Sequence, residues 1–120
     1  MYMYNSDNED RLSGIWIFHP SRDKDRLEQT LRLIENAALT PEDKYHSAYI
    51  LQHGTCDQHY LLAYKLSKDA YNNGIEGAEK LMYSAYDRYL LSTGRYQEYN
   101  TQFQPVPLVK KCKNNEEIRY

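Results

Sequence analysis

The chain has 120 residues, which suffice for one compact domain with its own core but not for two. Its formal net charge is −2, and its basic residues are scattered, so we expect no nucleic-acid partner. No apolar run reaches the roughly 18 residues of a membrane span, and the N-terminus resembles no secretory signal. We therefore expect a cytoplasmic location without membrane association.

The first 20 residues contain a short apolar run, residues 15–18, between Gly14 and Pro20. Four residues are too few for periodicity to separate a strand from an extended segment that crosses the helices. We predict an extended N-terminal segment over 1–20, which could add a little β-structure.

The next part of the chain carries signals for two helices. Ser21 is a fair N-cap for a helix over 22–38, in which apolar residues repeat at helical spacing: Leu27, Leu31 and Ile34. Thr40 followed by Pro41 is a clear start for the second helix, and Gly54 is a plausible stop.

Two more helices are predicted from about Thr55 to the "NNG" stretch at 72–74, and from 75 to 92. Each carries an apolar stripe on one face: Leu62, Ala63, Leu66 and Ala70 on the first, and Ala78, Leu81, Met82, Ala85 and Tyr89 on the second. Pro105 and Pro107 exclude a helix after them, so residues 104–120 are expected to form an irregular tail, frayed or laid on the surface. The sequence thus predicts a single all-α domain over 1–120, a bundle of about four helices.

The chain has two cysteines, Cys56 and Cys112, far apart in sequence. Such a pair is a poor disulfide framework, so we expect two reduced thiols. Cys56 could be a nucleophile activated at a helix start, although a small buried hydrophobe is the more common role. His53, Cys56 and His59 recur at three-residue intervals, but Gly54 separates them and a fourth ligand is not evident. We expect neither a metal nor a cofactor.

Three polar features could form a site. His53 lies in the last turn of its helix, where a histidine commonly caps a carbonyl. Arg88 falls at the edge of an apolar stripe, so it needs a carboxylate, carbonyls or an anionic ligand. Asp87 is expected to point further round the helix, toward Tyr83 and Lys80, in an ion pair or as a cap for the following loop.

The loop "YQEYNTQ" after the fourth helix is rich in hydrogen-bonding side chains. These groups could seal the end of the bundle, or they could bind a polar ligand. Periodicity does not distinguish the two readings.

Four stretches, "AYILQHG", "HYLLAYKLSKDAYNNG", "AYDRYLLSTGR" and "YQEYNTQF", occur in this order over about half of the chain. Together they resemble an uncharacterised bacterial domain family with Gln-His, Asp-Arg and Tyr-Gly-Thr-Gln motifs. The resemblance implies eight site positions that meet at one end of the bundle: Gln52, His53, Asp87, Arg88, Gln97, Tyr99, Thr101 and Gln102.

The chain departs from this pattern at two positions. Tyr86 stands where the family commonly has an acidic residue, which removes one carboxylate from any acid/base or metal scheme. Asn100 stands where the family has glycine, and Asn tolerates the left-handed conformation better than most residues, so the turn can survive.

Two functions remain open at this level. The chain could be a small enzyme or accessory catalytic domain acting on a polar or anionic small molecule. His53 would be the general acid/base, Asp87 its partner, and Arg88 the anion-binding group. It could instead be a binding or regulatory module that presents tyrosines to a protein partner or to a second copy of itself. Three tyrosines near one helix face form the expected stripe, unless they make a helix–helix contact: Tyr60, Tyr64 and Tyr71.

Overall fold

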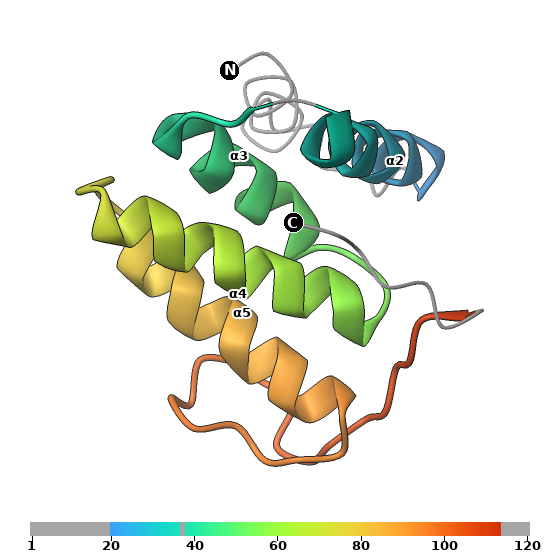
Figure 1. Ribbon diagram of the computed structural model, residues 1–120. Helices are drawn as coiled ribbons and strands as arrows, with labels where there is room; N and C mark the ends of the chain where they lie inside the picture. The colour runs from blue at the N-terminus through green and yellow to red at the C-terminus, as the bar shows by residue number, and fades with distance from the viewer. Residues whose placement is uncertain (1–19, 37, 114–120) are drawn as a thin grey trace, which may run out of the picture.

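The computed structural model describes residues 20–36 and 38–113, and these form a bundle of four α-helices (Figure 1). The helices are α2 (Pro20–Asn36), α3 (Pro41–Leu51), α4 (Asp57–Asn72) and α5 (Ala78–Ser92). No strand forms within these ranges, which confirms the all-α prediction. The extended segment predicted over 1–20 lies outside the described part except for Pro20, which begins α2, and so do the last residues of the tail, 114–120. No helix among the described residues is long and apolar enough to cross a membrane.

Helix α3 begins where the sequence predicts, with Thr40 as its N-cap and Pro41 in the first turn. The Thr40 hydroxyl accepts a hydrogen bond from the backbone N–H of Asp43, and the Asp43 carboxylate accepts one from the N–H of Thr40. This reciprocal pair satisfies two N–H groups that the helix leaves free.

The turn between α3 and α4 depends on a close approach at Gly54. A Cβ atom at this position would lie 2.5 Å from the Cβ of His59. Helix α3 has already ended at Leu51, so Gly54 is needed for this contact rather than as a helix stop.

The remaining boundaries differ from the sequence prediction by one to three residues, the usual uncertainty of helix ends. Helix α2 starts at Pro20, so Ser21 lies inside it and does not cap it. Helix α5 starts at Ala78, after a turn in which Gly74 and Gly77 both have positive φ, and Gly94 closes its C-terminal end, also at positive φ.

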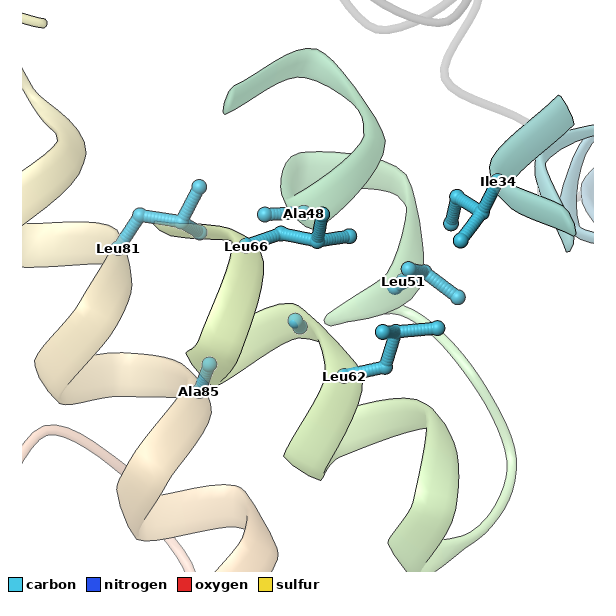
Figure 2. Packing of buried hydrophobic residues seen from close by; sticks show 8 residues of the cluster. Ile34, Ala48, Leu51, Leu62, Leu66, Leu81 and Ala85 are labelled. Atoms are coloured by element: carbon cyan, nitrogen blue, oxygen red, sulfur yellow. The ribbon is translucent and has the colours of Figure 1, made fainter. Parts of the chain in front are cut away.

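The hydrophobic core lies where α3, α4 and α5 meet, with α4 packed against both neighbours and α2 against α3 (Figure 2). Leu51, Ala63 and Leu66 are fully buried at its centre. The predicted stripes supply most of this core, and Ile34 brings in α2. Apolar burial therefore accounts for the packing of the helices.

The chain after α5 passes along the lower side of the bundle and returns toward the start of α4 (Figure 1). Its end, residues 108–112, is the C-terminal strap. Leu108 and Lys110 donate backbone hydrogen bonds to the carbonyls of Leu91 and Ser92, at 3.2 and 2.9 Å. Of the two states predicted for the irregular tail, frayed or laid on the surface, these residues adopt the second.

A disulfide between Cys56 and Cys112 fixes the strap to the start of α4, with 4.9 Å between the Cα atoms. The expectation of two reduced thiols is therefore wrong. That expectation is based on the long sequence separation of the two cysteines. The chain reverses through the loop after α5, so two residues that are distant in sequence lie next to each other.

Candidate functional site

The carboxylate of Asp87 organises the loop after α5. Asp87 is fully buried, and its two oxygens accept hydrogen bonds from the backbone N–H groups of Glu98, Tyr99 and Thr101 at 2.8–3.0 Å. The Thr101 hydroxyl donates a fourth bond of 2.7 Å. Of the roles predicted for Asp87, the cap for the following loop is the one that forms.

The same hydrogen bonds set the charge of Asp87. Burial raises the pKa of the carboxyl, but the four bonds from Thr101, Tyr99 and Glu98 outweigh it and hold the pKa below its ordinary value. Asp87 is thus a carboxylate at neutral pH, and its oxygens are committed to the loop.

Glutamine side chains make further hydrogen bonds within this loop and from the loop to α5. The Gln97 side chain accepts from the Gln102 N–H at 3.0 Å and donates to the Gln102 carbonyl at 3.1 Å. The Gln102 amide group donates to the Ser84 hydroxyl at 3.0 Å. That hydroxyl lies 3.5 Å from the side-chain oxygen of Gln52, at the end of α3. Four of the predicted positions, Gln52, Gln97, Thr101 and Gln102, are thus bound into the polar network around Asp87 and Ser84.

The two departures from the family pattern have clear local roles. Asn100 has φ +56°, the left-handed conformation that the turn is expected to need at this position. The Tyr86 ring packs between the rings of Tyr64 and Tyr99, at centroid distances of 4.9 and 6.1 Å. Tyr86 therefore contributes aromatic packing to the contact between α4, α5 and the loop.

Arg88 faces a cavity on the side of α5 next to α4. Its Nε atom is buried and has no hydrogen-bond partner. Burial lowers the pKa of Arg88 from its ordinary value, while the neighbouring Tyr60 opposes that shift, and the guanidinium remains charged. Tyr60 cannot neutralise it, because its own pKa is raised by burial and its hydroxyl donates to the Gly54 carbonyl at 2.8 Å.

The cavity has a volume of about 280 Å³ and is bounded by α4, α5, the loop and the C-terminal strap. Phe103 is fully exposed at its rim, and Leu108 and Lys110 of the strap line another side. Among the described residues that line it, none is acidic: Tyr60, Arg88, Leu91, Ser92, Gln102, Phe103, Gln104, Leu108 and Lys110.

His53 is exposed and lies just after the end of α3. Its ring packs edge-on against Tyr49 at 5.7 Å, and it is not among the residues that line the Arg88 cavity. The Asp87 carboxylate accepts its four hydrogen bonds from the loop after α5, and none of these bonds comes from His53. Of the predicted site residues, only Arg88 and Gln102 line this cavity.

Cys56, His59 and Cys112 come together at the start of α4, with ligand atoms within 4.8 Å of one another. His53, which the sequence grouped with two of them, is not in this cluster. The two sulfurs are bonded to each other, and the Nδ1 of His59 accepts a hydrogen bond from the Thr55 N–H at 3.0 Å. Burial lowers the pKa of His59, so the ring is neutral and its proton is on the other nitrogen. The two sulfurs are therefore used in the disulfide, and the Nδ1 of His59 is used in the turn before α4.

The tyrosine stripe expected on α4 is divided by the fold. Tyr60 is buried, Tyr64 packs against the core, and Tyr71 is exposed. A different aromatic cluster forms instead between α4, α5 and the loop, in which the rings of Tyr83 and Tyr99 lie 4.4 Å apart.

Sequence reasoning missed most of the cavity wall, namely Tyr60, Leu91, Ser92, Phe103, Gln104, Leu108 and Lys110. The pairing of Cys56 with Cys112 would have indicated the strap, because it places residues 108–112 beside α4.

Comparisons of this chain with known protein families, curated proteins and solved structures gave no match.

Proposed function

We propose that this protein binds a small organic anion in the Arg88 cavity. The observation that carries the proposal is a guanidinium with a buried, unpartnered Nε in a cavity whose described lining contains no carboxylate. A buried N–H group without a hydrogen-bond partner is costly, and a carboxylate or phosphate group of a ligand would supply the missing bond. Lys110 on the strap adds a second positive charge.

The ligand is expected to carry an apolar or aromatic part beside its anionic group. Leu91 and Leu108 line the cavity, and the exposed ring of Phe103 stands at its rim. A flat apolar group could cover Phe103 while the anion reaches Arg88. An aryl carboxylate or an aryl phosphate combines such an anionic group with a flat apolar group.

Acid/base catalysis by His53 and Asp87 stays a prediction. Binding is the better supported function, because no histidine, cysteine or acidic residue is among the described residues that line the cavity. General acid/base chemistry near neutral pH favours groups that titrate there.

The cytoplasmic location also stays a prediction. The Cys56–Cys112 disulfide weighs against it, because disulfides persist mainly in oxidising compartments.

The test is isothermal titration of the full chain with benzoate and phenyl phosphate, with benzamide as the neutral match of benzoate. We expect the two anions to bind and benzamide not to bind. Arg88→Ala should lower the affinity for both anions about tenfold or more, the range for loss of a charge-assisted hydrogen bond.

Arg95→Ala is the matched control, since Arg95 is an exposed arginine in the loop just after α5, outside the cavity. It should leave anion binding unchanged. Equal binding of benzoate by the parent and by a folded Arg88→Ala variant would refute the proposal, as would the absence of binding by either anion.

A further inference from the structure

We infer that the Cys56–Cys112 disulfide controls anion binding in the Arg88 cavity, because it holds the strap that forms one wall. This inference rests on the proposed function. Oxidised protein has the wall in place, and reduction of the disulfide releases it.

The strap contributes two of the residues that line the cavity, Leu108 and Lys110. Lys110 is bonded on both sides: its N–H donates to the Ser92 carbonyl at 2.9 Å, and its carbonyl accepts from the Asp57 N–H at 2.7 Å. These bonds hold the Lys110 backbone between α4 and α5, so the point from which its side chain extends depends on the strap's attachment.

Apolar burial contributes little to that attachment. Leu108 is 53% exposed and Val109 is 57% exposed, in contrast to the buried leucines of the bundle. Besides the disulfide, the strap is held by backbone hydrogen bonds at the ends of two helices and by the Cys112 N–H, which donates to the Asp57 carboxylate at 3.0 Å. Segments with few apolar contacts open at low free energy, so the covalent link decides how often this wall is open.

The disulfide can be reached from solvent at one end. Cys56 is buried, whereas Cys112 is partly exposed. The thiolate of a small dithiol attacks the Cys112 sulfur, the Cys56–Cys112 bond breaks, and Cys56 leaves and takes a proton. The second thiol of the reagent then attacks the mixed disulfide and releases Cys112 as a thiol. Two electrons and two protons pass to the protein, and the dithiol becomes a cyclic disulfide.

The experiment compares phenyl phosphate binding by three forms of the full chain: oxidised, reduced with dithiothreitol, and a Cys56→Ser, Cys112→Ser double variant. Hydrogen exchange at the amides of Lys110 and Cys112 reports on the strap without any ligand. We expect reduction to speed exchange at both amides and to weaken binding by roughly tenfold, with recovery on reoxidation.

Dithiothreitol should have no effect on the double variant, which excludes a general effect of the reagent. If the double variant does not fold, the reversible reduction of the parent chain decides the question. Unchanged binding and exchange in the reduced parent would overturn the inference and leave the proposed function standing. Absence of binding by the oxidised parent would remove the proposed function, and regulation of binding with it.

Discussion

The helical bundle and the segment after α5 are stabilised by different interactions. The bundle buries leucines and alanines of α3, α4 and α5 in one apolar core. The segment from Gly94 to Cys112 leaves large apolar side chains exposed, among them Phe103 and Val106, and is held by a buried carboxylate, backbone hydrogen bonds and a disulfide. The comparison shows that the helical bundle and the segment after α5 depend on different kinds of interaction, so substitutions can be chosen that perturb mainly one of them.

The largest effect is expected in the core of the bundle. Leu66 is fully buried, and Leu66→Ala should lower the free energy of unfolding by about 2–5 kcal/mol, because it removes apolar burial and leaves a cavity. Chemical denaturation followed by circular dichroism measures the loss. Val109→Ala, at an exposed position of the strap, is the matched control and should change stability by less than about 0.5 kcal/mol. Similar losses for the two would mean that the strap is part of the core.

The next largest effect is expected at Asp87. Asp87→Asn places an amide group against N–H donors that now bind the carboxylate, and it should cost about 1–3 kcal/mol. Unlike Leu66→Ala, it should also speed hydrogen exchange at Tyr99 and Thr101. Asp69→Asn, which alters a partly exposed pair with Lys44, should cost less than about 1 kcal/mol. An Asp87→Asn variant with normal exchange in the loop would show that other contacts hold it.

The sequence predicted the bundle well because its signals are local. The stripe of α4 and the capping residues of α3 act within one helix, and both are confirmed. Helix boundaries differ from the prediction by one to three residues, at α2 as well as at the glycine-containing turn before α5. The strap was not predicted, because its attachment depends on the pairing of Cys56 with Cys112, which no local pattern contains.

The site was predicted in part. The positions from the family resemblance include Asp87, Thr101, Gln97 and Gln102, and these four do come together. Their roles could not be assigned from the sequence, because helical spacing placed Asp87 near Lys80 and could not show a loop that folds back over the carboxylate. The cavity beside Arg88 could not be predicted either, because residues of the loop and the strap complete its wall.

A smaller effect is expected from pH. The folded-state pKa of Asp87 lies below its ordinary value of 3.8, so its stabilising contribution is complete above that value and is lost as the pH falls through the folded-state pKa. The stability difference between the parent and Asp87→Asn should therefore stay constant from about pH 7 to 5 and narrow below about pH 4. Denaturation curves at several pH values measure it. A difference that widens in acid would mean that the carboxyl is protonated in the native loop.

The smallest effect is expected at Asn100, where the loop requires a left-handed residue. Asn100→Val should cost about 1–2 kcal/mol, because a β-branched residue is strained at positive φ. Asn100→Gly should leave stability within about 0.5 kcal/mol of the parent, since glycine adopts this conformation freely but loses more entropy on folding. Glu98→Val is the control in the same loop, where φ is not positive. Thermal unfolding of the four proteins measures the series, and equal losses for Asn100→Val and Glu98→Val would mean that the loop relaxes rather than enforcing the turn.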